Sequence, residues 1–226
     1  MALSRGAVVG STRPVTYRDV VTAGYDELGP RYRDLFASSP ARMRYAQRVR
    51  HRLAPGSVVV DLGCGPGEPA TRLLAVDHHV LGVDLSAGQL GLAVSAAPSA
   101  LLVRADIADF ALRPGSVDAV VSFFALGHLP PPAHAPLFAA IATWLRPGGL
   151  LLTTTPRIPG DMVENWIGVP MYFGGIGDEA TLAAVTASGL AVEASEMTAE
   201  HEPDGQLSRF HWLTATKPPP ATTPRQ

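Results

Sequence analysis

Residues that suit a small-molecule site stand where short apolar runs end. The three valines 58–60 lead into Asp61 and then into a loop, 63–67, in which glycine occupies alternate positions. Glycine has no Cβ and tolerates positive φ, so the backbone of such a loop is able to touch a bound ligand directly. A second apolar run ends in Asp84, and an acid at the carboxyl end of the next parallel strand suits a ribose diol. These residues predict a nucleoside-containing ligand.

Two other kinds of glycine loop fit this chain less well. A dinucleotide site requires G-x-G-x-x-G, and counting from Gly63 the third glycine falls on position 68, which is Glu68. The P-loop ending of Gly-Lys-Ser/Thr is also absent. For the loop taken alone, a nicotinamide-dependent oxidoreductase and a plain strand-to-helix turn stay as alternatives.

The loop Asp61-Leu62-Gly63-Cys64-Gly65-Pro66-Gly67 resembles the first motif of the class I S-adenosyl-L-methionine (SAM)-dependent methyltransferases of the small-molecule type. Further landmarks of that family follow in the expected order, ending with Trp144-Leu145-Arg146-Pro147-Gly148-Gly149 before a fifth strand. The resemblance covers residues 17–217. It implies SAM as the cofactor, with Asp84 on the ribose, Asp106 on the adenine amino group, and Leu85 and Ile107 on either side of the ring. The full set of cofactor-binding residues that it implies is Tyr25, Asp61, Gly63, Gly65, Gly67, Asp84, Leu85, Gln89, Asp106, Ile107 and Phe123. For Gln89 a capping box with Ser86 is the alternative, and for Tyr25 it is anchoring of the arm to the core.

The implied fold class is α/β, a Rossmann-like sheet of seven strands whose last strand is antiparallel. An N-terminal helical arm or cap is expected over residues 1–56, with one or two helices broken at Gly29-Pro30. The SAM-binding domain is expected over 57–217, and a disordered tail over 218–226, which holds several prolines. We expect the first residues of the arm to be flexible.

A long segment between the fifth strand and the next helix, 156–177, is expected to be a substrate lid, because a loop of this length with its own apolar side chains usually covers something. A purely structural small core is the alternative. With Phe124, which ends the fourth strand, its apolar residues form the predicted substrate-binding set of Phe124, Trp166, Met171, Tyr172 and Phe173. Apolar walls with few polar groups are typical of small-molecule pockets. We therefore expect methyl transfer to an O, N or C atom of a small, largely apolar or aromatic metabolite.

The first candidate for a general base is His128, because imidazole titrates near neutrality and this residue follows the fourth strand. Packing of the loop is the alternative, and His201 and His211 are weaker candidates. Some proteins of this fold bind SAM without transferring methyl and act as cyclases or partner subunits, so that function also stays open. No metal site is predicted, since the single cysteine, Cys64, has no Cys/His cluster around it.

Charge is uneven along the chain. Residues 1–56 hold ten arginines against four acidic residues, although the net charge of the whole chain is −2. Arg44, Arg48 and Arg52 recur every four residues and would share one face of a helix, either as a solvated face or as a surface for an anionic substrate, carrier protein or nucleic acid. Nucleic acid is the less favoured partner. Because no apolar run reaches about 20 residues, we expect no membrane association and a cytoplasmic location. We expect a monomer or a homodimer.

Overall fold

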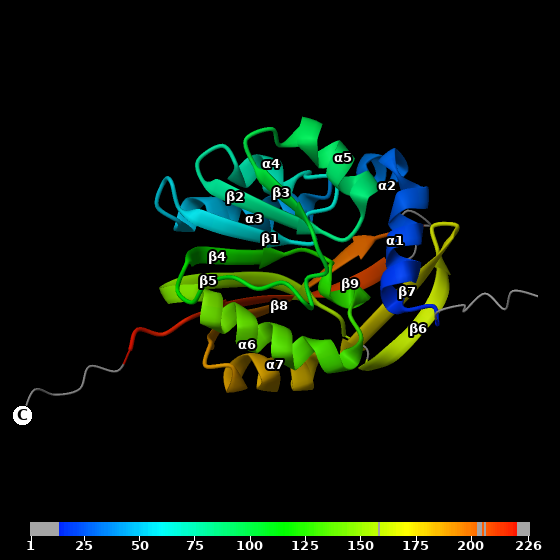
Figure 1. The fold of residues 1–226 in the computed structure, drawn as a ribbon. Helices are drawn as coiled ribbons and strands as arrows, with labels where there is room; N and C mark the ends of the chain where they lie inside the picture. Colours follow the sequence, from blue (N-terminus) through cyan, green and yellow to red (C-terminus); the bar gives the residue numbers. More distant parts are fainter. Residues whose placement is uncertain (1–13, 158, 203–204, 206, 221–226) are drawn as a thin grey trace, which may run out of the picture.

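The computed structural model describes residues 14–157, 159–202, 205 and 207–220. Seven strands form one sheet in the order β3-β2-β1-β4-β5-β9-β8 (Figure 1). They are β1 (Val58–Leu62), β2 (His79–Asp84), β3 (Leu101–Arg104), β4 (Val117–Ser122), β5 (Leu145–Thr155), β8 (Ala191–His201) and β9 (Leu207–Thr216). Neighbours from β3 to β5 are parallel, whereas β9 is antiparallel to both β5 and β8. The predicted fold class is confirmed. The predicted flexible start, up to residue 13, and the tail from residue 221 lie outside the described residues.

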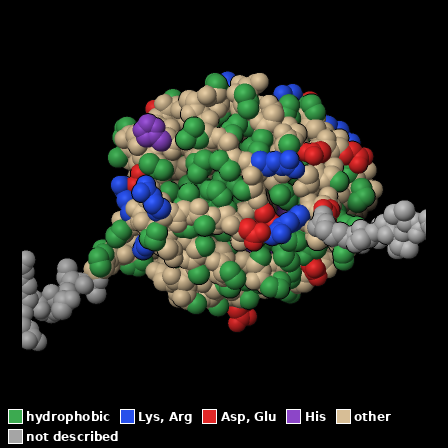
Figure 2. Space-filling model, in the orientation of Figure 1, with side chains coloured by type: hydrophobic (Ala, Val, Ile, Leu, Met, Phe, Trp, Pro, Cys, Tyr) green, Lys and Arg blue, Asp and Glu red, His purple; other side chains and the backbone are tan. Residues whose placement is uncertain are grey.

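The surface mixes apolar and charged side chains. On the face in Figure 2, Lys and Arg side chains lie in several places beside Asp and Glu side chains. Within the part of the chain that the structure describes, every helix is too short or too polar to cross a membrane.

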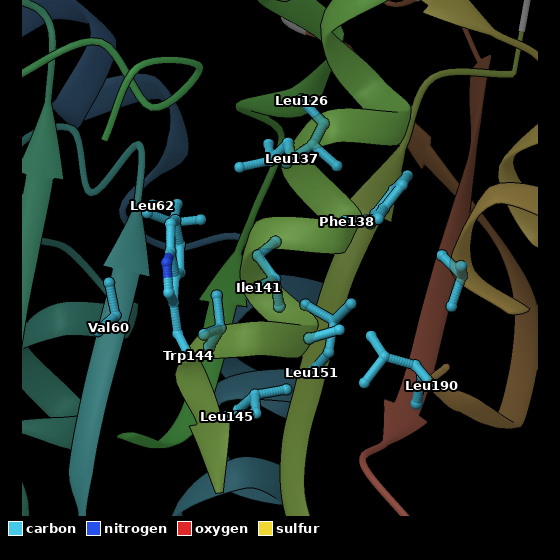
Figure 3. Packing of buried hydrophobic residues seen from close by; sticks show 14 of the residues in the cluster. Val60, Leu62, Leu126, Leu137, Phe138, Ile141, Trp144, Leu145, Leu151 and Leu190 are labelled. Atoms are coloured by element: carbon cyan, nitrogen blue, oxygen red, sulfur yellow. The ribbon is translucent and has the colours of Figure 1, made fainter. Parts of the chain in front are cut away.

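The first side of the sheet is covered by α6 (His134–Trp144) and α7 (Asp178–Ala187). Val60 pairs with Val120, which pairs with Leu151, so the three strands present one row of apolar side chains to the same cluster (Figure 3). Phe138 and Ile141 of α6 are fully buried in this cluster. Side chains alternate between the two faces of a strand, which explains why the valines next to this row point the other way.

The second side is covered by α3 (Pro40–Arg52) and α4 (Ala70–Leu74). Val59 and Val121 face this cluster, together with the fully buried Tyr45 and Val49 of α3. The ring of Tyr45 stacks on Trp212 of β9 at a centroid distance of 3.8 Å. Burial of both faces accounts for strands that are apolar almost throughout.

The arm consists of α1 (Tyr17–Leu28) and α2 (Pro30–Phe36), with the predicted break at Gly29. It lies against α5 (Ala87–Ala96), whose N-cap Ser86 accepts a hydrogen bond from the backbone N–H of Gln89 at 3.0 Å. The arm therefore passes over the ends of β1 and β2, where the glycine loop begins.

The segment 156–177 is not an irregular loop. It forms a β-hairpin of β6 (Pro159–Trp166) and β7 (Val169–Ile176), in which all eight residues of each strand are paired. The turn places Ile167 and Gly168 at positive φ of 53° and 89°, a combination typical of two-residue hairpin turns. β7 packs on α1 so closely that a Cβ on Gly24 would lie 2.7 Å from Met171 Cε. Two short 3-10 turns, η1 (Leu126–His128) and η2 (Pro131–Ala133), contact β7 from the other side.

Candidate functional site

A cavity opens at the carboxyl ends of β1, β2, β3 and β4, between the sheet and the arm. It brings together ten of the residues predicted for the site: Tyr25, Gly63, Gly65, Asp84, Leu85, Asp106, Ile107, Phe123, Phe124 and His128. Tyr17, Val21 and Tyr32 of the arm complete its wall. Open α/β sheets bind ligands at this edge, so the cavity is the candidate functional site.

The glycine loop forms one side of the cavity. Gly63 and Gly65 have positive φ of 74° and 54°, a region that side chains disfavour. A Cβ on Gly63 would lie 2.1 Å from the Cβ of Ala125, which no side chain at position 63 could avoid. The loop thus requires glycine both for its conformation and for its close contact with the segment that follows β4.

Asp84 holds the glycine loop in place. Its Oδ2 accepts a hydrogen bond from the backbone N–H of Gly65 at 2.8 Å, and its Oδ1 accepts one from the N–H of Ser86 at 2.9 Å. Burial raises the pKa of Asp84, and these backbone N–H groups oppose that shift because they favour the carboxylate. The backbone N–H of Leu85 also stabilises the carboxylate, and the four lone-pair sites of a carboxylate leave capacity to accept from a hydroxyl group of a ligand.

Asp106 lies under the first turn of α1. Its Oδ1 accepts a hydrogen bond from the N–H of Ala108 at 2.9 Å, and its Oδ2 accepts from Tyr17 Oη and Arg18 Nε. Burial and the hydrogen bond to Asp106 raise the pKa of Tyr17 to about 12. Arg18 also reaches Asp109, at 2.6 Å. Tyr17 and Arg18 were missed by the sequence analysis, because nothing in their spacing indicates which acid they reach.

Arg42 was also missed, although it adjoins the arginine series that the sequence singled out. Its side chain is buried, and its guanidinium carbon lies 4.5 Å from the ring centroid of Phe124, 4.9 Å from that of Phe36 and 5.5 Å from that of Tyr32. Among the described residues no hydrogen-bond acceptor or carboxylate pairs with it. Burial raises the pKa of the Asp61 carboxyl and the charge of Arg42 opposes this shift, although the two groups form no ion pair. Two of its neighbours, Tyr32 and Phe124, line the cavity, so the cation lies directly behind the cavity wall.

Tyr25 and His128 meet on the far wall of the cavity. The Tyr25 hydroxyl lies 2.7 Å from His128 Nε2, and His128 Nδ1 lies 2.8 Å from the backbone oxygen of Tyr172. Burial lowers the pKa of His128 to about 4, an effect that the Tyr172 carbonyl partly offsets. The imidazole is therefore neutral near pH 7.

Residues 59–149 match the family described as a methyltransferase domain. The ubiquinone biosynthesis O-methyltransferase of Burkholderia thailandensis is 33% identical over 132 residues, which make up 55% of this chain and 54% of that protein. The trans-aconitate 2-methyltransferase of Paracidovorax citrulli is 37% identical over 125 residues, 54% of this chain and 47% of that protein. Over these residues the chain is similar to SAM-dependent methyltransferases. It spans about half the length of the curated relatives that it matches.

Solved structures agree with this methyltransferase fold. The 1,6-didemethyltoxoflavin-N1-methyltransferase of Burkholderia thailandensis, with bound 1,6-didemethyltoxoflavin and S-adenosylhomocysteine, has a TM-score of 0.69 at 18% identity, over 95% of this chain and 99% of that one. The [4+2]-cyclase SpnF has a TM-score of 0.68 at 18% identity, over 90% and 97% of the two chains.

Three of the residues predicted to bind the methyltransferase cofactor lie outside the cavity lining. Asp61 is buried below it and accepts a hydrogen bond from the Thr71 hydroxyl at 2.6 Å. Gly67 faces α5, where a Cβ would lie 3.2 Å from Ala93. Gln89 neither completes a capping box nor reaches the cavity. Its Nε2 donates to the backbone oxygens of Tyr25 and Gly29, at 2.9 and 3.1 Å, and so fastens the end of α1 to α5.

The hairpin residues predicted to contact the methyltransferase substrate lie one layer behind the cavity wall. Met171 is fully buried against α1, and the Tyr172 hydroxyl donates to Asp161 at 2.8 Å. Trp166 stacks on Phe36 at a centroid distance of 5.8 Å, and Phe173 packs on the His128 ring at 5.0 Å. These side chains support the residues that line the cavity, whereas Phe124 lines it directly.

The remaining histidine candidates are remote from the site. His211 is buried between Thr155, at 2.9 Å, and Ser195, at 2.7 Å, and does not line the cavity. His201 ends β8 and is exposed. Neither takes part in the arrangement around Tyr25.

The arginine series on α3 is neutralised within the protein. Arg48 and Arg52 pair with Glu196 and Glu193 of β8, and Arg44 donates to the Tyr45 hydroxyl at 2.8 Å. These pairings favour the solvated-face interpretation over a surface for nucleic acid or another anionic partner.

Proposed function

We propose that this protein is a SAM-dependent methyltransferase that acts on an O, N or C atom of a small, largely apolar or aromatic metabolite. The observation that carries the proposal is the presence of the glycine loop, Asp84 and Asp106 on one cavity at the carboxyl edge of the sheet. Arg48 and Arg52 of α3 pair with Glu196 and Glu193, which favours a small-molecule substrate over nucleic acid.

The side chains around the cavity match the groups that SAM presents. The Arg42 cation, which forms no ion pair among the described residues and lies behind Tyr32 and Phe124, complements the carboxylate of the amino-acid part. Asp84 accepts from the ribose hydroxyls, and Asp106 Oδ1, which has a single donor, accepts from the adenine amino group. When bound, SAM supplies an activated methyl group on a positively charged sulfur.

The chain's own contribution to the reaction is mainly positioning and the exclusion of water. Tyr17, Val21 and Tyr25 of α1 cover the cavity from above, and Phe123 and Phe124 form its floor at the end of β4. These apolar walls suit an aromatic or aliphatic acceptor. The hairpin 159–176 supports this cover from behind and is the proposed lid.

Calorimetry with S-adenosylhomocysteine, with NAD as the competing ligand, tests the cofactor. We expect tight binding of the first and none of the second. Asp84→Ala should weaken binding by at least tenfold, because it removes a buried acceptor that holds the glycine loop and would accept from the ribose hydroxyls. Asp77→Ala is the matched control, since Asp77 is a partly exposed carboxylate paired with Arg50 away from the cavity. Equal binding by the Asp84 variant and the wild type would refute the site.

A second candidate function is SAM binding without methyl transfer, which the similarity to the [4+2]-cyclase SpnF in fold keeps open. Formation of S-adenosylhomocysteine from SAM distinguishes the two. 1,6-Didemethyltoxoflavin, which a structural relative binds, is the first acceptor to try, and trans-aconitate, named for another relative, is the acidic comparison. Methyl transfer to either acceptor, or to a related small molecule, supports the enzyme.

A further inference from the structure

The hydrogen bonds of His128 determine where its proton is. Nδ1 faces the backbone oxygen of Tyr172 at 2.8 Å, and a carbonyl only accepts, so Nδ1 carries the hydrogen. In a neutral imidazole the other nitrogen then has a lone pair and no hydrogen. Nε2 must therefore accept the hydrogen bond that joins it to Tyr25 at 2.7 Å. The Tyr25 hydroxyl is the donor.

This arrangement fixes what Tyr25 offers to a ligand. Its only hydrogen points to His128, and its oxygen is also hydrogen-bonded by the Tyr32 side chain, so the lone pair that remains is what it presents to the cavity that it lines. Burial keeps the pKa of Tyr25 well above 10, the nearby Tyr32 and Asp84 act in the same direction, and the Arg42 cation opposes them. The rings of Trp166 and Phe173 enclose His128 on the side of the hairpin. Tyr25 is thus a neutral hydroxyl that donates to His128 and can only accept a hydrogen bond from a ligand.

We propose that Tyr25 and His128 form a proton relay that removes the proton of a neutral O–H or N–H acceptor group during methyl transfer. This inference rests on the proposed function. As the acceptor atom bonds to the methyl carbon, the sulfur–carbon bond breaks and its electron pair neutralises the sulfonium. The acceptor's proton moves to the Tyr25 oxygen, and the Tyr25 proton moves to His128 Nε2, which becomes an imidazolium and releases its proton after product leaves.

The relay assigns different roles to its three members. Tyr25 touches the acceptor and is the catalytic residue. His128 receives the proton through Tyr25, and the carbonyl of Tyr172 is a positioning group that sets the tautomer. The relay also selects the substrate class. A carboxylate acceptor has no proton to lose, so the site is built for phenol, alcohol or ring N–H groups rather than for an acid such as trans-aconitate.

The free protein tests the arrangement without any substrate. Long-range proton–nitrogen NMR spectra of the imidazole rings report the tautomer of each of the seven histidines, and His128→Gln identifies the relevant signals. We expect His128 to be neutral with hydrogen on Nδ1 at pH 7. Tyr25→Phe should shift the Nε2 signal, because its donor is lost, and Tyr45→Phe, on α3 outside the cavity, should not. A hydrogen on Nε2, or an imidazolium at pH 7, would overturn the relay.

Kinetics with two phenols tests whether the relay acts during methyl transfer. Phenol is neutral at about pH 8, whereas 4-nitrophenol is largely ionised there and needs no base. Tyr25→Phe should lower kcat/KM for phenol by about 100-fold or more and for 4-nitrophenol by only a few-fold, with S-adenosylhomocysteine affinity reported separately by calorimetry. Equal losses for the two phenols would overturn the relay. If the wild type does not bind S-adenosylhomocysteine, the proposed function is wrong. This outcome is distinguishable from failure of the relay alone.

Discussion

The guanidinium carbon of Arg42 lies 4.5 Å from the ring centroid of Phe124. Phe124 has a positive φ of 67°, which costs a residue with a side chain roughly 1–3 kcal/mol. Its backbone N–H donates to the Thr154 hydroxyl at 2.5 Å, which helps to hold this conformation. A buried cation and a strained aromatic residue thus adjoin each other at the cavity wall. The positive charge behind this wall suits an anionic group of a ligand.

Replacing the cation of Arg42 tests this role. Arg42→Met should weaken binding of S-adenosylhomocysteine by about tenfold to 100-fold, the value of a charged hydrogen bond. It should lower the melting temperature of the ligand-free protein by only a few degrees, because it removes cation–π contacts but no ion pair among the described residues. Calorimetry and thermal unfolding measure the two effects. Arg44→Met, on the same helix but directed at Tyr45, is the control. Unchanged affinity in the Arg42 variant would exclude it from the site.

Asp61 should make stability depend on pH. Burial raises its pKa to about 6, the hydrogen bond from Thr71 opposes this, and the charge of Asp84 adds to it. Because the folded-state pKa is raised, its contribution to stability is complete below pH 3.8 or so and is lost as pH rises through about 6. Asp61→Asn keeps an acceptor for Thr71 without the titration. Between pH 4 and pH 7 the wild type should lose about 2–3 kcal/mol relative to this variant. A difference in urea unfolding free energy that is independent of pH would contradict the prediction.

Two substitutions in the glycine loop should have different effects on ligand affinity and on stability. Gly65→Ala meets only ordinary contact, 3.6 Å from Tyr32, so the variant should fold with a backbone cost of about 1 kcal/mol. Its methyl group faces the cavity, and S-adenosylhomocysteine affinity should fall at least tenfold. Gly67→Ala instead places a Cβ 3.2 Å from Ala93, so it should lower the melting temperature more and the affinity less. If Gly65→Ala binds normally, the loop is only a turn.

Trp166 tests the hairpin as a lid. Its ring lies between Tyr25 and Tyr32, which line the cavity, and Phe36 and Phe173, which do not. Trp166→Ala should cost about 2 kcal/mol of stability and, by loosening Tyr25, raise KM or lower kcat for the acceptor severalfold, with S-adenosylhomocysteine affinity nearly intact. Met162→Ala, an exposed residue of the same hairpin, is the control. Normal turnover by the Trp166 variant would leave the hairpin with a purely structural role.

Local patterns in the sequence predicted the strands of the main sheet, the glycine loop and Asp84, because each depends on residues within a short window, whereas Asp106 was implied by the resemblance to a family. Arg42 could not be predicted in the same way. Helical spacing placed Arg44, Arg48 and Arg52 on a common face, but which face meets carboxylates is decided by Glu193 and Glu196 on a strand far along the chain. Gln89 shows the same limit, since its capping pattern was present and its side chain nevertheless binds the end of α1.

The hairpin shows a second limit of prediction from sequence. Glycines and prolines between 156 and 177 predicted an irregular loop, yet the turn at Ile167 and Gly168 lets the two flanking segments pair along their full length. Side chains alternate along such strands, so the register decides that Tyr172 offers its backbone oxygen to His128 while its hydroxyl reaches Asp161. That register cannot be obtained from composition.

Gly24 leaves no room between α1 and the hairpin, since a Cβ there would lie 2.7 Å from Met171 Cε and 3.0 Å from the backbone oxygen of Pro170. The two segments are far apart in the chain but have complementary surfaces, so neither is a separable module. Replacing the hairpin with that of a relative, in order to change the range of acceptors, would also replace Met171, and the new side chain would not fit against Gly24 of α1. Such a chimaera requires α1 from the same donor. Among relatives, the residues at positions 24 and 171 should covary.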